Sequence, residues 1–368
     1  MTMTQAPRGT AAVEGSLLEW RRRRRSYLRT MLVLTGVLVL SVALALSWGA
    51  VTVPLPDVWA IVVDHLRGAG DAARGITGDV IIWQIRAPRV VLAMLVGAGL
   101  AVVGVAVQAM VRNPLADPYV LGVESGAAAG AVAVIYFLGP FSVSFLSPTM
   151  GAFLGALATM ALVFALARSG GRVSSLRLLL VGVALSYGLS GFTSFVLYAS
   201  HDPAAQQQVM FWILGSLGGA TWAQVPLVLA VVVAGSGFYW WWSRRLNALA
   251  LGDASATSLG IDPDRARIVL FVVSSAMVAA IVSTVGPIGF VGLVVPHVTR
   301  MFVGAEHRRV LPASILVGAS YLVVVDLFSR VVFAPSEVPI GIVTAVLGTP
   351  FFLWLLRSRG SRVLVDAS

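Results

Sequence analysis

Long stretches without a single charged residue dominate this sequence. Residues 30–56 carry no charge, and residues 125–167 form an uncharged stretch that is too long for one crossing of a bilayer. Only 11% of the 368 residues are charged, whereas a soluble globular domain carries roughly 25%. These features exclude an ordinary water-soluble protein, and we predict an all-α polytopic membrane protein.

The uncharged stretches divide into about ten expected transmembrane helices when they are split at prolines, glycines and charged residues. The expected helices lie at residues 30–56, 90–111, two within 125–167, 178–200, 223–242, two within 268–303, 311–333 and 340–356. A basic segment at 1–29 precedes this membrane domain at 30–357, and a tail at 358–368 follows it. The helix at 223–242 ends in three tryptophans followed by Arg244-Arg245, a pattern typical of an anchor at a membrane interface.

The arginines predict how the chain is oriented in the membrane. All 26 basic residues are arginines, and with the helices expected above 21 of them lie on one side. The other side holds Arg67, Arg74, Arg86, Arg89 and Arg330. Because cytoplasmic loops carry the excess of positive charge, both termini are expected in the cytoplasm. We interpret Arg21 to Arg25 as a topology determinant, with no nucleic-acid partner, and the uncharged run after them is longer than the roughly 7–15 apolar residues of a signal peptide.

The chain contains no lysine and no cysteine, and these absences exclude several mechanisms. No residue is present to supply a P-loop lysine, a Schiff-base lysine, a thiol nucleophile or a thiolate metal ligand. The four histidines are scattered without metal-ligand spacing: His65, His201, His297 and His307. We therefore expect no catalytic residue, bound cofactor or metal site in this chain, which is not an enzyme, and we expect any energy source to lie in a partner.

Few ionisable residues lie inside the expected helices. Glu124 lies near the inner end of the third helix, and Asp326 lies one helical turn from Arg330 near the outer end of the ninth. An ATP-independent secondary transporter or a channel, the competing class, would need such groups at mid-membrane depth, and their scarcity disfavours it. An ion pair between Asp326 and Arg330 is one explanation for these two residues.

Glycines recur at three- to five-residue spacing in the second, third and fourth expected helices. They are Gly97, Gly99, Gly104, Gly122, Gly126, Gly130, Gly151 and Gly155. Such spacing lets helix backbones approach closely, so it predicts helix packing and not a nucleotide-binding loop. Gly286-Pro287 interrupts a hydrophobic stretch instead, and broken helices of this kind can line a pathway through a membrane.

Five further segments form a recognisable pattern. They are Trp83 to Arg89, Gln108 to Pro118 with Leu121-Gly122-Val123, Leu249 to Asp253 with Leu259-Gly260, Gly286 to His297, and Glu337 to Gly341 with Thr344. In this order they closely resemble the FecCD family, the permease subunits of type II ABC importers for ferric siderophores, haem and cobalamin. The resemblance runs from about residue 30 to residue 357.

The resemblance implies a ten-helix, BtuC-like permease fold and a set of partners. In a bacterial cell membrane, the chain would pair with a second permease subunit, identical or paralogous, around a central path. Two cytoplasmic ABC ATPase subunits would hold ATP and magnesium, and an extracytoplasmic substrate-binding protein would deliver the substrate. This agrees with the absence of a P-loop lysine, since the ATPase is then a separate chain.

The resemblance also implies roles for individual residues at the two sides of the membrane. Arg86, Arg89 and Arg330 match the arginines that form salt bridges with acidic residues of the binding protein. The segment 247–265 matches the short cytoplasmic helices that dock on the ATPase, and the residues expected to couple there are Leu251, Gly252, Asp253, Leu259 and Gly260.

Two more sets of residues follow from the same resemblance. Motif residues expected to shape the pathway are Asn113, Pro114, Asp117, Pro118, Gly286, Gly289, Gly292, Pro296 and His297. The cytoplasmic gate is expected at Ser174, Ser175 and Leu176, although some relatives carry a hydroxyl residue where this chain has Leu176. A ferric siderophore is the expected substrate because most family members carry one, and haem and cobalamin are the alternatives.

Overall fold

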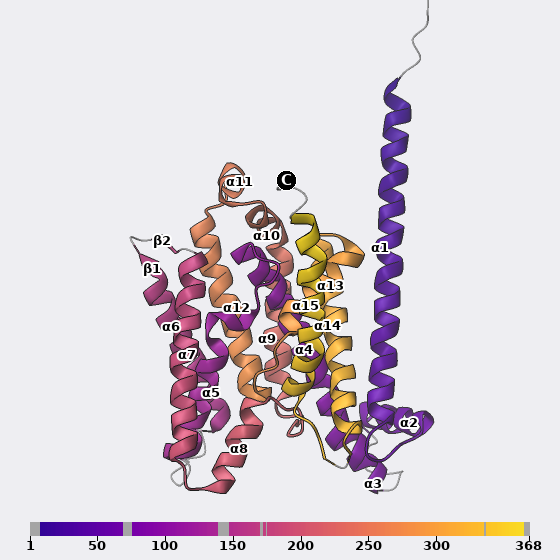
Figure 1. Cartoon of the computed structure of the whole chain (residues 1–368). Helices are drawn as coiled ribbons and strands as arrows, with labels where there is room; N and C mark the ends of the chain where they lie inside the picture. The colour runs from indigo at the N-terminus through magenta and orange to yellow at the C-terminus, as the bar shows by residue number, and fades with distance from the viewer. Residues whose placement is uncertain are drawn as a thin grey trace, which may run out of the picture.

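A computed structural model describes residues 8–68, 76–138, 147–169, 172–173, 175–334 and 336–363. Within these residues the regular secondary structure is helical except for a two-residue antiparallel ladder between β1 (Arg168–Ser169) and β2 (Arg172–Val173) (Figure 1). The predicted all-α class is therefore confirmed.

The first half of the chain forms a series of helices and short helical turns. They are α1 (Arg8–Ser47), α2 (Leu55–Leu66), α3 (Ile76–Asp79), a π-helical turn at Val80–Arg86, α4 (Ala87–Val111), a 3-10 turn at Pro118–Leu121, α5 (Val123–Ala133) with a π-helical extension at Val134–Leu138, α6 (Pro148–Ala167) and α7 (Ser175–Ala199). The basic N-terminal segment, as far as the structure describes it, and the first expected span up to Ser47 thus belong to one continuous helix, α1. The rest of that expected span, at 48–56, is a non-helical connection followed by the start of α2.

The second half of the chain continues the bundle. Its helices are α8 (Pro203–Ile213), α9 (Val225–Trp241), α10 (Ser243–Ala250), α11 (Asp253–Ser258), α12 (Pro263–Val285), α13 (Val291–Val303), α14 (His307–Val331) and α15 (Ile340–Val363). The helix α15 extends past residue 357, into the segment that was expected to be a tail.

The structure does not confirm the expected number of ten transmembrane helices. Among the described residues, six helices are long and apolar enough to cross a membrane, or seven if the bent pair α9 and α10 forms one span. Three more apolar helices are shorter, at Val123–Phe137, Val291–Val303 and Ile340–Trp354. The 13 residues of α13 extend about 20 Å, less than the roughly 30 Å of a bilayer core, because Gly286-Pro287 ends α12 before α13 begins.

Glycines allow α4 to lie at the centre of the bundle. A Cβ on Gly97 would overlap the backbone of Gly318 in α14, and a Cβ on Gly104 would overlap the backbone of Gly292 in α13. In the same way Gly130 of α5 touches the backbone of Gly151 in α6. The small-residue spacing therefore does bring helix backbones together, as the sequence predicted.

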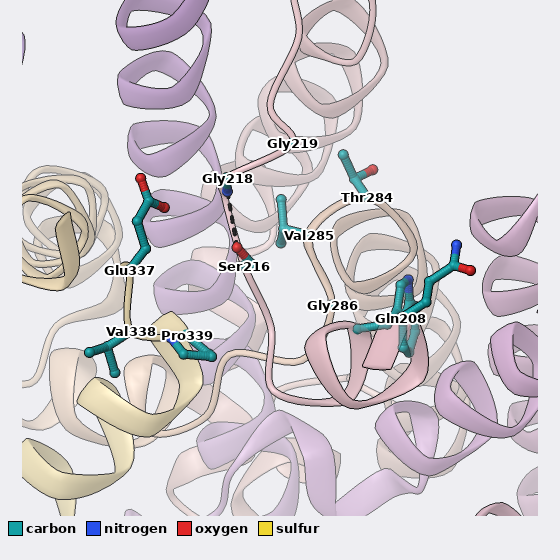
Figure 2. Close-up of a pocket in the computed structure, with 11 residues that line it drawn as sticks. Gln208, Ser216, Gly218, Gly219, Thr284, Val285, Gly286, Glu337, Val338 and Pro339 are labelled. Carbon is teal, nitrogen blue, oxygen red and sulfur yellow. Dashed lines mark hydrogen bonds between the residues drawn. The ribbon is translucent and has the colours of Figure 1, made fainter. Parts of the chain in front are cut away.

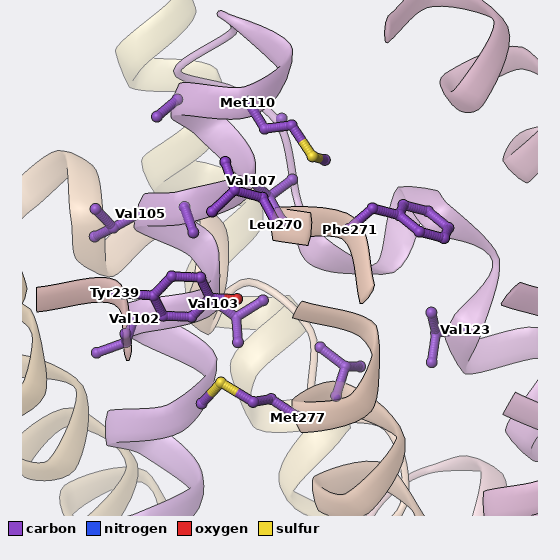
Figure 3. Packing of buried hydrophobic residues seen from close by; sticks show 14 of the residues in the cluster. Val102, Val103, Val105, Val107, Met110, Val123, Tyr239, Leu270, Phe271 and Met277 are labelled. Atoms are coloured by element: carbon purple, nitrogen blue, oxygen red, sulfur yellow. The ribbon is translucent and has the colours of Figure 1, made fainter. Parts of the chain in front are cut away.

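The largest cluster of buried apolar side chains lies where α4, α5, α9 and α12 meet (Figure 3). Val103 and Val107 of α4 face Leu270 and Met277 of α12 across this cluster, and Tyr239 enters it from α9. The Tyr239 hydroxyl lies 2.7 Å from the Ser274 hydroxyl, so the buried polar atom is hydrogen-bonded.

The two ends of the bundle differ (Figure 1). One end carries α10 and α11 together with the start of α1 and the end of α15, and we name it the α11 end. The opposite end carries α2, α3 and α8, and we name it the α2 end. The described parts of both chain termini therefore lie at the same end, as an even number of crossings requires.

Candidate functional site

The three predicted docking arginines lie together at the α2 end, but their side chains are buried. Each is at most 7% exposed. The guanidinium of Arg89 donates from Nε to Asp326 Oδ1 at 2.8 Å, and its Nη1 lies 2.8 Å from Glu337 Oε2. Arg330 pairs with the other oxygen of Asp326 at 3.1 Å, and it donates to the carbonyl oxygen of Ala45 at 3.0 Å.

Asp326 therefore lies between two guanidinium groups, and its carboxylate is fully buried. Glu337 is the accessible member of this charge cluster, with 45% of its side chain exposed. The local pair between Asp326 and Arg330 that the sequence offered as an explanation is present, and Arg89 and Glu337 extend it into a four-residue network. The role of these arginines in docking stays a prediction.

Arg86 pairs with backbone and not with a carboxylate. Its Nη1 donates to the carbonyl oxygens of Leu46 at 2.7 Å and Ser47 at 2.9 Å, and its Nη2 donates to that of Val51. These carbonyls belong to the end of α1 and the turn that follows it, where a helix leaves its last acceptors unpaired. Arg86 thus ties the end of α1 to the start of α4.

A pocket of about 410 Å³ opens beside this charge cluster (Figure 2). Glu337, Val338 and Pro339 form one side of it, and Thr284 and Gln208 lie on the other. The turn that contains Ser216, Gly218 and Gly219 crosses between them, and the Gly218 N–H donates to the Ser216 hydroxyl at 3.0 Å. The lining is mostly apolar with a few hydrogen-bonding side chains, which is typical of a site for an organic ligand.

The broken helix at residues 286–290 forms part of this pocket, through Gly286. Gly286 ends α12 at φ +72°, and Phe290 precedes α13 at φ +67°. Backbone groups freed by the break are paired: the Ser216 N–H donates to the Val285 carbonyl at 2.9 Å, and the Ile288 N–H donates to the Tyr119 hydroxyl at 3.1 Å. Such pairing is what irregular backbone requires inside a membrane.

Two of the sequence motifs meet at this break. Asp117 accepts hydrogen bonds from the backbone N–H groups of Tyr119, at 2.9 Å, and Phe290. Pro118 packs against Gly292, whose missing side chain leaves room for the ring. The segment after α4 therefore supports the segment before α13.

Gln108 makes a second connection between the same motifs. Its side-chain N–H groups lie 3.3 Å from the carbonyl oxygens of Gly292 and Leu293, and its carbonyl oxygen accepts from Arg300 at 2.5 Å. Three other residues of the predicted pathway set have these surroundings: Asn113 accepts from the Leu115 N–H at 2.9 Å, Pro296 lies inside α13, and His297 is buried near Phe351. Their role in a pathway stays a prediction. Gly289 has open space where a side chain would point.

Short helices form at the segment expected to couple to an ATPase. Leu251 follows α10 with 72% of its surface exposed, and Leu259 follows α11 with 63% exposed. Gly252 at φ +109° and Gly260 at φ +75° take backbone conformations that favour glycine, so each allows a sharp turn after its leucine. Two exposed leucines at turns of the α11 end are suited to contact another protein.

Asp253 attaches this segment to the bundle. It forms an ion pair with the buried Arg267 of α12, and a second one with Arg112 at 3.7 Å. Arg112 ends α4 in a left-handed conformation, at φ +57°. The exposed leucines are therefore connected through Asp253 both to α12 and to the central helix α4.

The predicted gate is only partly described. Ser174 lies outside the described residues, Ser175 is the first residue of α7, and Leu176 is 65% exposed.

Tyr119 and Gln208 are the residues that motif reasoning overlooked. Tyr119 could have been found because it directly follows the second proline of the Asn113–Pro118 motif. Gln208 could have been found because it belongs to the polar run before residue 209.

Comparison with known proteins identifies relatives along most of the chain. The chain is 44% identical over 288 residues to the cobalamin import system permease protein BtuC of Halobacterium salinarum, covering 78% of this chain and 76% of that protein. It is 42% identical over 286 residues to the hemin transport system permease protein HmuU of Yersinia pestis, covering 76% and 85%. Identity to the vitamin B12 import system permease protein BtuC of Escherichia coli is 37% over 340 residues, covering 92% and 98%.

A solved structure and a family model agree with these relatives. The structure, described as an inward-facing conformation of a putative metal-chelate type ABC transporter, is similar with a TM-score of 0.77 and 32% identity, covering 90% of this chain and 99% of that one. A model of the FecCD transport family matches residues 37–358. The chain therefore belongs to the FecCD transport family.

Proposed function

We propose that this FecCD-family permease subunit carries an intact metal chelate of the corrinoid or porphyrin type across the membrane. The observation that supports this most directly is the pocket beside the broken helix at the α2 end, where Gln208, Thr284 and Glu337 offer hydrogen bonds within an apolar lining. The named relatives are permeases for cobalamin and hemin. The ferric siderophore expected from the sequence is the alternative substrate.

The proposal includes partners at both ends and an orientation. We place the α11 end in the cytoplasm, because 21 of the 26 arginines then lie inside, and Leu251 and Leu259 there would contact ATPase subunits that bind ATP and magnesium. The α2 end would receive an extracytoplasmic binding protein. A second permease subunit would cover α7, whose exposed apolar side chains include Tyr187, Phe195 and Tyr198.

Uptake into proteoliposomes tests the function. The complete transporter would be reconstituted with its binding protein, and uptake of cyanocobalamin, haem and a panel of ferric siderophores would be measured with and without ATP. We expect uptake of cyanocobalamin or haem that needs both ATP and the binding protein. Uptake restricted to ferric siderophores would overturn the substrate proposal, and uptake without ATP would indicate a secondary transporter.

A pair of neighbouring glutamines tests the pocket itself. Gln208 lines the pocket, whereas Gln207 is exposed and does not line it. Because a lost hydrogen bond costs about 1 kcal/mol, Gln208→Leu should raise the KM for uptake about fivefold. Gln207→Leu should leave the KM unchanged, and equal effects of the two variants would contradict this role of the pocket.

Arg89 and Arg330 already form ion pairs with carboxylates of this chain. A carboxylate of the binding protein can dock on them only if it replaces one of these partners. Glu337 is the exposed partner of Arg89, so we propose that an acidic residue of the binding protein replaces it. Glu337→Gln should then strengthen binding of the binding protein at low salt, and Arg89→Gln should weaken it. Unchanged affinity in both variants, measured beside their unfolding curves, would contradict docking at this cluster.

A further inference from the structure

A groove of about 730 Å³ lies between α6, α9 and α12, at residues other than those of the pocket at the α2 end. The helix α12 packs against both α6 and α9 and forms the floor with Ala276 and Met277. Phe153 of α6 and Val231 and Phe238 of α9 form the walls. Apart from hydroxyl residues near the α2 end, the lining is apolar.

The groove has the dimensions of one acyl chain. Along α9 it extends from Leu227 to Phe238, about 16 Å at 1.5 Å per residue, which is about half of the roughly 30 Å hydrocarbon core. Leu227, Val272 and Met150 at its edge are all more than 40% exposed. Both α6 and α12 are long and apolar enough to cross a membrane, and so is α9 when it is counted with α10 as one bent span. We therefore expect these edges to face hydrocarbon.

A cationic site lies just beyond the end of the groove toward the α11 end. The ring of Phe238, which lines the groove, lies 5.0 Å from the ring of Trp242. The guanidinium carbon of Arg245 lies 4.4 Å from the centre of that Trp242 ring and 5.8 Å from that of Trp241. The chain bends by 62° between α9 and α10, which turns Arg245 out of the membrane-spanning direction. Indole rings with an arginine at such a bend are typical of the headgroup level of a bilayer.

The combination of a chain-sized apolar groove with a cation at one end matches an amphiphile that carries a negative headgroup. We propose that the groove binds an anionic phospholipid of the leaflet at the α11 end. One acyl chain lies over Met277 between α6 and α9, and the phosphate group lies at Arg245. The site is independent of the substrate and of the pocket beside Glu337.

Native mass spectrometry of the purified full-length chain tests this site. The chain would be mixed with dioleoyl-phosphatidylglycerol and with dioleoyl-phosphatidylcholine, and the ratio of the two lipids retained would be measured. We expect phosphatidylglycerol to be retained preferentially, and Arg245→Gln to lower that preference about fivefold. Arg244→Gln is the matched control, because Arg244 is equally exposed and charged but lines neither the groove nor the Trp242 ring.

A second pair of variants tests the groove. Ala234 lines it, whereas Val233 is exposed on α9 and does not line it. Ala234→Trp should abolish retention of the preferred lipid, and Val233→Trp should not. Equal losses for Arg244→Gln and Arg245→Gln would show attraction to general surface charge and overturn the proposal. Retained lipid in Ala234→Trp would also overturn it.

Discussion

At the scale of single residues, the buried carboxylate of Asp326 is the central member of the charge cluster at the α2 end. It forms ion pairs with both Arg89 and Arg330 where water is excluded. Removing one member of such a network leaves an uncompensated buried charge, so Asp326→Asn should lower the free energy of unfolding by about 3–5 kcal/mol. Denaturant unfolding of the purified chain in detergent would measure this.

Glu337→Gln is the control for that loss, because the Glu337 side chain is half exposed and reaches Arg89 from the edge of the cluster. Its effect on unfolding should stay below about 1 kcal/mol, as for partly solvated ion pairs. Equal losses for the two variants would mean that Asp326 is not the central residue of the network.

The contact between Gly104 and Gly292 is a second residue-scale feature with a measurable consequence. A methyl group on Gly104 would overlap the backbone of α13, which cannot move aside as a flexible side chain could. We expect Gly104→Ala to lower the melting temperature of the purified chain. Gly36→Ala in α1, where a methyl group meets nothing within 4 Å, should leave it unchanged or raise it, since alanine favours helix.

At the scale of elements, α10 and α11 present their exposed leucines at the end of the bundle away from the pocket. If these leucines enter a pocket of the ATPase, each buries apolar surface worth about 1.5–3 kcal/mol. Leu251→Asp should therefore reduce ATP-driven uptake about tenfold or more while the chain still folds. The ratio of substrate transported to ATP hydrolysed in proteoliposomes is the measurement.

Leu66→Asp is the matched control for the coupling variant. Leu66 ends α2 at the opposite end of the bundle and is as exposed as Leu251. Its substitution should leave the ratio of transport to hydrolysis unchanged. Normal transport by Leu251→Asp would contradict the assignment of this segment to coupling.

At the scale of the whole molecule, the absence of cysteine makes the proposed orientation directly testable. Thr52→Cys introduces a thiol at the α2 end and Ser258→Cys introduces one on α11, and both positions are exposed. A maleimide that cannot cross membranes should label Thr52→Cys in intact spheroplasts. It should label Ser258→Cys only after permeabilisation, and the reverse pattern would contradict the orientation.

Much of the fold follows from local patterns in the sequence. The breaks at Gly286-Pro287 and after Val111 were predicted because proline and glycine act on the backbone where they stand. The expected number of spans is not confirmed, because α5 and α13 are shorter than a bilayer and only their packing against neighbours allows them to lie in the bundle. Hydropathy alone does not distinguish a short buried helix from one half of a full crossing.

The candidate site divides in the same way. The family resemblance indicated Arg86, Arg89, Arg330 and Asp117, but apart from the local pair of Arg330 with Asp326 the sequence did not indicate what each contacts. Arg89 pairs with Asp326 across 237 residues of sequence, and Asp117 supports the backbone before α13 from the end of α4. Such pairs depend on which helices are neighbours, and a single sequence does not contain that information.

The sequence by itself determined that this chain is a helical membrane protein of the FecCD type without a P-loop lysine. Repeated apolar runs of about 20 residues are the length that crosses a bilayer. The absence of lysine and cysteine excludes a P-loop lysine, a thiol nucleophile and a thiolate ligand, whatever the fold of the chain. Only the tertiary structure decided that Arg89 and Arg330 are buried in a charge network, that Leu251 and Leu259 are exposed, and that a groove ends beside Arg245. Burial and charge pairing are properties of helices brought together, because each surface is covered only by a neighbour distant in sequence.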